Sequence, residues 1–279
     1  MKYYRFLPVM AFGLLFSYSV FHVFTLEGDQ DSPLRKAKNG LYVVAHRGAH
    51  IGIPENSLPA YQKAIDLGCD FVEIDVRTTK DGKFVSVHNP TVDEYVTGLS
   101  GNVSELSLAE IRALDIGRRI SPGWKNTKVP TFEEILQLCH GKIGIYLDLK
   151  AANVTELIEI IKKYGMERDI FWYIPATRSK EITELITNCP DCILMPDPGH
   201  KKNINSVTSR FNVLVLATDM GELSKSFIDN AHRNHSIVIV DEEKGTEAEW
   251  TQIIDWDTDG IQTDDPERLI SFLKRHGQR

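Results

Sequence analysis

Two periods of apolar and polar residues alternate along most of the chain. Short apolar segments of four to seven residues, several with a period of two, predict β-strands. Longer segments with apolar residues three or four positions apart predict helices that bury one face. The predicted strands are 41–45, 70–76, 143–148, 170–174, 192–195, 212–216, 236–240 and 259–262. The predicted helices are about 57–67, 131–139, 153–164, 178–187, 201–209, 222–234, 246–255 and 266–275.

The order of these segments determines the predicted fold. Eight strands, each followed by a helix, are typical of an α/β protein of the (β/α)₈ TIM-barrel class. We expect one such domain over residues 41–279. A chain of this length has ample material for a hydrophobic core.

A further predicted strand, 83–88, has no helix before it. The pair Asp81-Gly82 precedes it, and this dipeptide is typical of a β-hairpin turn. We therefore expect an antiparallel hairpin arm after the second strand. If Val76 pairs near Phe84, His88 falls roughly opposite Val72 and Glu73.

The N-terminus has a different pattern. Lys2 and Arg5 precede an almost uncharged apolar segment, 6–26, which predicts a secretory signal peptide or an uncleaved signal anchor within residues 1–26. About twenty residues just suffice to cross a bilayer. We favour the anchor because no A-x-A cleavage site is evident. Residues 27–40 are polar and predict a linker, so the protein is expected to be exported, either membrane-anchored or secreted or periplasmic.

Charge and cysteine content narrow the classes of partner and site. The chain of 279 residues carries a formal charge of −7, which gives no electrostatic reason to expect a nucleic-acid partner. Cys189 and Cys192 form one CPDC motif without a second pair of zinc ligands. A redox pair or a disulfide is possible for these two, but we favour packed thiols. Cys69 and Cys139 lie in apolar surroundings and are expected to be buried.

Polar residues of the types that act in catalysis and metal binding cluster at the ends of the first three barrel strands. Glu73 and Asp75 share one face of an apolar strand, and Asp148 lies at the end of the next predicted barrel strand. The carboxyl ends of barrel strands meet at one mouth, so these three acids should converge. Such carboxylates repel one another unless a cation holds them ionised. Oxygen ligands favour one divalent cation, Mg²⁺ or Ca²⁺, with Mn²⁺ possible.

The remaining polar residues at this mouth indicate the reaction class. Arg47 and Lys150 supply positive charge for an anionic substrate group. His46 and His88 offer a base and an acid that titrate near neutrality. Together with a hard cation, these groups suit the cleavage of a phosphate ester.

These residues also carry a family resemblance. Residues 46–89 read HRGAHIGIPENSLPAYQKAIDLGCDFVEIDVRTTKDGKFVSVHN and resemble the signature of the glycerophosphodiester phosphodiesterase family. Further likeness lies in VPTFEEIL at 129–136, YLDLK at 146–150 and TDGIQTDDPERL at 258–269. The resemblance covers about 41–275. It implies a metal-dependent hydrolase that converts glycerophosphodiesters to sn-glycerol 3-phosphate and an alcohol.

The resemblance also implies roles for individual residues. His46 and His88 match the catalytic acid-base pair, and Arg47 matches the phosphate-binding arginine. The matching metal ligands are Glu73, Asp75 and Asp148, the last of which replaces a glutamate common in the family. Glu55 and Asn89 would lie beside the direct ligands, and Asn89 stands where the family usually has an aspartate.

The implied mechanism begins with attack of a glycerol hydroxyl on phosphorus, with one histidine accepting its proton and the other protonating the leaving alcohol. A cyclic phosphate would form and then be hydrolysed. Direct attack by metal-bound water is the alternative.

Several alternatives remain at this stage. The substrate is a small glycerophosphodiester or, because the predicted anchor lies near a membrane, a lysophospholipid cleaved by lysophospholipase D-type activity. A barrel that binds phosphodiesters without cleaving them is a third possibility. A glycosidase is disfavoured because Glu73 and Asp75 are too close on one strand to flank a sugar. Tyr173 is expected either to form the floor of the pocket or to pack in the core. Residues 241–243 are expected to form a solvated loop, and His50 is expected to lie away from the site.

Overall fold

The computed structural model describes residues 34–279, apart from 39, 97–99 and 243. The predicted signal or anchor at 1–26 and most of the linker at 27–40 lie outside the described residues. Among the helices of the described part, none is both long and apolar enough to cross a bilayer.

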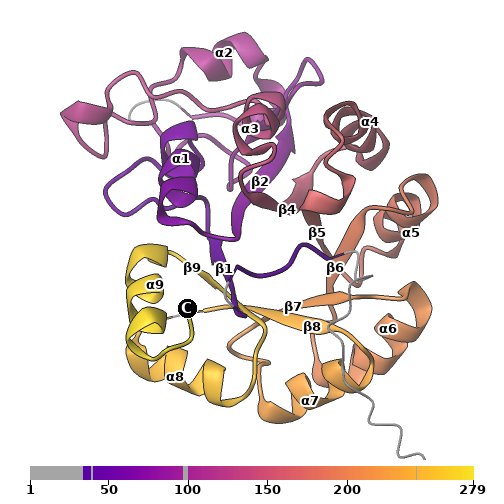
Figure 1. The fold of residues 1–279 in the computed structure, drawn as a ribbon. Coiled ribbons are helices and arrows are strands. Elements are labelled where there is room, and N and C mark those ends of the chain that lie inside the picture. Colours follow the sequence, from indigo (N-terminus) through magenta and orange to yellow (C-terminus); the bar gives the residue numbers. More distant parts are fainter. Residues whose placement is uncertain (1–33, 39, 97–99, 243) are drawn as a thin grey trace, which may run out of the picture. The chain divides into compact units, whose positions relative to one another are not determined.

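Eight parallel strands form a nearly closed barrel with helices around its outside (Figure 1). The hydrogen-bonded path runs β6-β5-β4-β2-β1-β9-β8-β7, so β6 and β7 lie at its two ends. Each strand lies within three residues of its predicted bounds, and the predicted barrel class is confirmed. The strands are β1 Tyr42–Ala45, β2 Phe71–Thr78, β4 Gly144–Ala151, β5 Ile170–Pro175, β6 Ile193–Asp197, β7 Val215–Asp219, β8 Ile237–Asp241 and β9 Gly260–Thr263.

The helices that connect these strands also lie within three residues of their predicted bounds. Local capping explains several starting points, such as Thr131, whose side chain forms a reciprocal capping box with Glu134. The helices are α1 Leu58–Leu67, α3 Phe132–Cys139, α4 Val154–Tyr164, α5 Ser179–Asn188, α6 Ile204–Phe211, α7 Lys225–Arg233, α8 Glu247–Asp255 and α9 Pro266–Arg275.

Strand alternation separates two apolar layers. On β2, Val72, Ile74 and Val76 belong to the core between the strands and the surrounding helices. Phe71, on the opposite face, belongs to the core inside the barrel and stacks on Phe171 with ring centroids 4.3 Å apart. The interior face of β2 therefore carries an aromatic residue first and the carboxylates of its later residues above it.

Strand β3, Phe84–Ser86, pairs antiparallel with the end of β2. The register joins Thr78 to Phe84 and Val76 to Ser86, so the expected pairing of Val76 near Phe84 is wrong by two residues. The reason is that β2 continues to Thr78 before the turn, two residues beyond its predicted end. His88 consequently lies further along β2 than expected, and the backbone N–H of Val87 donates to the carbonyl of Asp75 at 2.9 Å.

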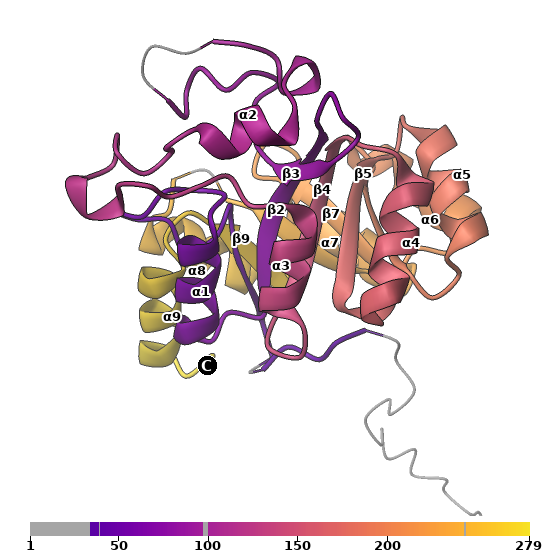
Figure 2. The same ribbon diagram turned by 90° about the horizontal axis from the view of Figure 1, so that it is seen from above.

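The chain between β3 and α3 forms an additional layer that the sequence patterns did not predict. It contains the helix α2, Leu108–Ala113, and an apolar cluster in which Tyr95 and Ile111 pack with Val85 of β3. Figure 2 shows α2 beyond the end of β2, on the side of the barrel where that strand finishes. This insertion therefore stands beside the barrel mouth.

Cys189 and Cys192 form a disulfide, so our preference for packed thiols was wrong. Cys189 ends α5, and the chain then turns so that the Cys192 N–H donates to the Cys189 carbonyl at 3.0 Å. This turn brings the two Cα atoms within 5.3 Å, a separation suited to a disulfide. Cys69 and Cys139 are buried free thiols, as expected.

Candidate active site

The loop after β1 places His46 and Arg47 beside the acidic strand β2. Arg47 has a positive φ of 52°, and its backbone N–H donates to Glu73 Oε2 at 2.7 Å. Its guanidinium donates to Glu55 Oε1 at 3.2 Å, and its Nε lies 3.8 Å from Asp75 Oδ2. The tight turn requires Gly48, where a Cβ would come within 2.8 Å of Ala60. Arg47 is therefore held between three carboxylates with its side chain beside the cavity.

Glu73, Asp75 and Asp148 form a compact group of carboxylates, with one oxygen of each lying within 4.8 Å of the others. The pairing of Asp75 with Asp148 between β2 and β4 produces this proximity. Burial, and then the charge of Asp75, raise the pKa of Glu73 well above its usual range. Burial also raises the pKa of Asp148, against the opposing charge of Lys150. The three carboxylates therefore have too little positive charge around them to hold all three ionised.

One oxygen of this group lacks a hydrogen bond. Asp75 Oδ2 accepts one from Asn56 Nδ2 at 2.8 Å, but the buried Oδ1 accepts none from any described residue. Lys150 Nζ lies 3.3 Å from that oxygen and donates instead to Asp148 Oδ2 at 2.5 Å. Three convergent carboxylates, one with an unsatisfied buried oxygen, fit a hard divalent cation such as Mg²⁺ or Ca²⁺.

Asn56 holds Asp75 in place, although the sequence analysis did not identify it. Its side-chain oxygen accepts hydrogen bonds from Tyr61 Oη at 2.9 Å and from Ser86 Oγ at 2.8 Å. Asn56 is 1% exposed and has a positive φ of 49°, a conformation that asparagine tolerates better than most residues. The signal available in the sequence was its place directly after Glu55 in the PEN motif.

His88 is fixed by its neighbours on three sides. Its Nδ1 lies 2.7 Å from Asn89 Oδ1, its N–H donates to Tyr95 Oη at 3.0 Å, and its carbonyl accepts from Arg77 Nη2 at 2.6 Å. Asn89 thus provides the acceptor for Nδ1 without a negative charge. A proton on Nδ1 leaves Nε2 as the basic nitrogen.

His46 is held by Asp264, a residue that the sequence analysis did not single out. Its Nδ1 lies 2.8 Å from Asp264 Oδ1. Burial alone would lower the pKa of His46, but the hydrogen bond with Asp264 and the charge of Glu73 raise it to about 9. His50 was expected to lie away from the site, but its Nε2 lies 3.7 Å from Asp264 Oδ1, so that prediction was wrong.

Replacing this acceptor should shift the titration of His46. In the metal-free protein, Asp264→Asn is expected to lower the pKa of His46 from about 9 towards the ordinary histidine value of 6.5. Because the folded-state pKa lies above the unfolded one, the pair stabilises the fold below about pH 6.5, and this contribution is lost as the pH rises through about 9.

An NMR titration of the imidazole Cε1–H signals measures this shift. The matched control is Asp259→Asn, which removes the carboxylate 2.8 Å from His232 Nε2 and should leave the His46 titration as in wild type. An unchanged His46 titration in Asp264→Asn would contradict the assignment.

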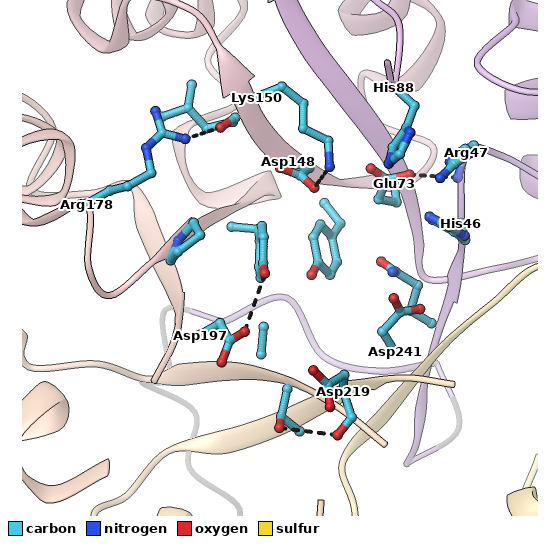
Figure 3. A pocket seen from close by; sticks show the side chains of 17 residues that line it. His46, Arg47, Glu73, His88, Asp148, Lys150, Arg178, Asp197, Asp219 and Asp241 are labelled. Atoms are coloured by element: carbon cyan, nitrogen blue, oxygen red, sulfur yellow. Dashed lines mark hydrogen bonds and ion pairs between the residues drawn. The ribbon is translucent and has the colours of Figure 1, made fainter. Parts of the chain in front are cut away.

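These groups line one side of a cavity of about 470 Å³ at the barrel mouth (Figure 3). The other side carries Asp197, Asp219 and Asp241, from the ends of β6, β7 and β8. Asp241 therefore belongs to a strand and lines the cavity, which corrects the expected solvated loop at 241–243. Tyr173 also lines the cavity, and its hydroxyl donates to Asp197 Oδ2 at 3.5 Å.

The structure brings all the predicted site residues together. Six of them line the cavity directly, and the other three contact these six. The six are His46, Arg47, Glu73, His88, Asp148 and Lys150. The three are Asp75 beside Lys150, Glu55 beside Arg47, and Asn89 beside His88.

Comparisons with known proteins agree with this arrangement. Residues 46–186 match the model of the glycerophosphoryl diester phosphodiesterase family. A glycerophosphodiester phosphodiesterase from Caldanaerobacter subterraneus is 28% identical over 253 residues, which cover 84% of this chain and 98% of that protein.

Two solved structures share the fold. A glycerophosphodiester phosphodiesterase from Agrobacterium tumefaciens superposes with a TM-score of 0.74 and 25% identity, covering 83% of this chain and 99% of the other. A phosphodiesterase from Oleispira antarctica, solved with the product sn-glycerol-3-phosphate, has a TM-score of 0.77 and 18% identity. Its match covers 84% of this chain and 96% of the other.

Proposed function

The chain belongs to the glycerophosphoryl diester phosphodiesterase family, and on this basis we propose that it hydrolyses glycerophosphodiesters to sn-glycerol 3-phosphate and an alcohol. The observation that carries the proposal is the convergence of two histidines, an arginine and three carboxylates on one cavity. Each part has a use in phosphodiester cleavage, and the relatives that match most of the chain carry the same activity in their names.

We propose that Glu73, Asp75 and Asp148 hold one divalent cation, Mg²⁺ or Ca²⁺. When bound, such an ion stabilises negative charge on the phosphate oxygens during the reaction. Arg47 also stabilises this negative charge, since its guanidinium can bind two phosphate oxygens at once. Lys150, whose Nζ donates to Asp148 Oδ2 and lines the cavity, would add a second positive charge beside the phosphate.

His46 and His88 move the protons. One accepts the proton of the glycerol hydroxyl as its oxygen bonds to phosphorus, and the other protonates the oxygen of the alcohol as its bond to phosphorus breaks. Water then opens the cyclic phosphate with the two roles reversed. In both rings Nδ1 is engaged, by Asp264 in His46 and by Asn89 in His88, so each Nε2 is the atom left for the substrate.

An assay with the purified full-length chain tests this function. We expect choline release from glycerophosphocholine in the presence of Mg²⁺ or Ca²⁺, loss of release with EDTA, and recovery when the cation is restored. Lysophosphatidylcholine in a parallel reaction tests the lysophospholipase D-type alternative. Absence of metal-dependent alcohol release from any diester would contradict the proposal and favour a barrel that only binds phosphodiesters.

We also propose that the protein is exported. The apolar segment 6–26 after two basic residues supports this placement. The disulfide between Cys189 and Cys192 supports it independently, because disulfides persist mainly in oxidising compartments.

A further inference from the structure

Two exposed isoleucines lie on loops outside the barrel strands, Ile51 after β1 and Ile120 between β3 and α3. Ile51 is 65% exposed and Ile120 is 38% exposed, and within the described part of the chain these are the large apolar side chains that lie open to solvent. Single exposed apolar residues are common on protein surfaces. Here a hydrogen bond joins the two loops that carry them, which calls for a further explanation.

A hydrogen bond joins the two loops that carry these isoleucines. Trp124 Nε1, in the second loop, donates to the carbonyl of Gly52, in the first, at 2.7 Å. We call the surface formed by residues 51–53 and 117–126 the rim surface. It contains the half-buried Trp124 together with both exposed isoleucines.

Backbone hydrogen bonds within the second loop hold it in one conformation. The N–H of Ile116 donates to the Thr127 carbonyl at 3.0 Å, and the N–H of Ile120 donates to the Gly117 carbonyl at 2.9 Å. A Cβ at Gly117 would lie 1.9 Å from the Trp124 carbonyl oxygen, so the loop closes tightly on itself. Ile120 is therefore presented by a fixed loop and cannot fold inward without breaking these bonds.

The charge of the rim surface is opposite to that of the whole protein. Arg118, Arg119 and Lys125 are exposed on it. Residues 51–53 and 117–126 contain no acidic residue, and Asp115 borders them, with its Oδ1 accepting hydrogen bonds from the N–H groups of Gly117 and Arg118. The chain as a whole carries a formal charge of −7. Exposed basic groups around aliphatic and tryptophan side chains are the composition that binds anionic lipid headgroups and the adjoining acyl boundary.

The rim surface lies on the same side of the barrel as the cavity. Its first loop follows β1 and continues directly from His46 and Arg47. Its second loop belongs to the insertion after β3, on the side where the strands finish (Figure 2). A flat partner that touches the rim surface would therefore face the mouth of the barrel.

We propose that the rim surface docks the catalytic domain onto an anionic lipid bilayer. The isoleucines and Trp124 enter the interface between headgroups and acyl chains, and the three basic residues contact the lipid phosphates. This contact holds the barrel mouth towards the membrane. The proposal uses no catalytic residue and goes beyond the proposed hydrolysis of glycerophosphodiesters.

Fluorescence quenching of Trp124 tests the proposal on the full-length chain. Vesicles of phosphatidylcholine, with or without one-third phosphatidylglycerol, carry a doxyl-labelled lipid that quenches tryptophan at the bilayer surface. Subtraction of the Trp124→Phe signal isolates Trp124 from Trp172 and Trp250, which are fully buried, and from Trp256. Quenching is decisive here because segment 6–26 is itself predicted to enter a bilayer, so bound protein alone would not show which surface makes contact.

We expect quenching of Trp124 on the anionic vesicles and little on phosphatidylcholine alone. Each basic residue near an anionic surface contributes about fivefold in binding, so the double variant Arg118→Gln/Arg119→Gln should need roughly 25-fold more lipid. Ile51→Ser/Ile120→Ser should weaken quenching as well. The matched control is Lys162→Gln/Lys163→Gln, an exposed pair on α4 with the same change of charge, which should behave as wild type.

Hydrolysis of soluble glycerophosphocholine without vesicles should be unchanged in all these variants, which separates failure of docking from failure of the proposed function. Vesicle-bound protein whose Trp124 is not quenched overturns the proposal. Quenching of Trp124 that changes neither with the phosphatidylglycerol content nor in Arg118→Gln/Arg119→Gln also overturns it. Arginine-dependent binding of poly-glutamate without quenching by vesicles would assign the surface to an acidic protein instead.

Discussion

Glu73→Gln is expected to reduce kcat/KM by about 10³-fold, because it removes one of three negative ligands from the proposed cation site. A bound metal stabilises transition-state charge by several kcal/mol, and each 1.4 kcal/mol corresponds to about tenfold in rate. The glutamine oxygen can still accept the hydrogen bond from the Arg47 N–H, so the turn after β1 should remain intact. Steady-state kinetics and calorimetric titration with Mg²⁺ and Ca²⁺ measure the effect.

The same variant should not lose stability when metal-free. Burial and the charge of Asp75 raise the pKa of Glu73, so its ionised form destabilises the folded state as the pH rises above the unfolded value. A neutral glutamine removes that penalty, and the melting temperature of the metal-free variant at neutral pH should equal or exceed that of wild type.

The matched control is Glu55→Gln, which also loses a charge beside Arg47 but lies outside the carboxylate triad. Its activity should fall by no more than roughly 10- to 100-fold. Equal losses in the two variants, or unchanged cation binding by Glu73→Gln, would argue against the assigned cation site.

His88→Ala is expected to lower kcat by about 10² to 10⁴-fold, the usual contribution of a positioned acid or base. The backbone of His88 is held by Tyr95 and Arg77 independently of its ring, so the substitution should leave the loop in place. Added imidazole can then enter the space of the missing ring and should restore part of the activity in proportion to its concentration. Kinetics across an imidazole series, with thermal unfolding of each protein, measure both effects.

His232→Ala is the corresponding control, since the His232 ring also contacts a side-chain oxygen, that of Asp259, but His232 is not among the cavity residues. Its kcat should match that of wild type whatever happens to its melting temperature. If His88→Ala keeps its activity, or loses it only in step with its stability, His88 is structural and the proton must be handled elsewhere.

The sequence by itself determined the helices and strands of the barrel, and the site residues that lie on or directly after β1 and β2. Strand and helix periods depend on local alternation of apolar residues, so the barrel strands were placed within three residues. Glu73 and Asp75 share a face because side chains alternate along any strand, and His46 and Arg47 follow a strand end in the chain itself. These features need no knowledge of distant contacts.

Only the tertiary structure decided the partners of those residues. Asp264 reaches His46 across 218 positions of sequence because β9 pairs with β1 to bring the end of the barrel back to its start. The acidic wall of Asp197, Asp219 and Asp241 exists because three separate strands end at the same mouth. No local pattern marks such residues, since a single carboxylate after a strand is equally compatible with a solvated loop.

Register and chain reversal were likewise beyond local patterns. The position of His88 depended on where β2 ended, and a difference of two residues shifted its partner along the strand. Cys189 and Cys192 formed a disulfide because the turn after α5 brought their Cα atoms to 5.3 Å. The physical reason is common to both cases: sequence periodicity fixes which way a side chain faces, whereas the atoms that it meets depend on the packing of elements far apart in the chain.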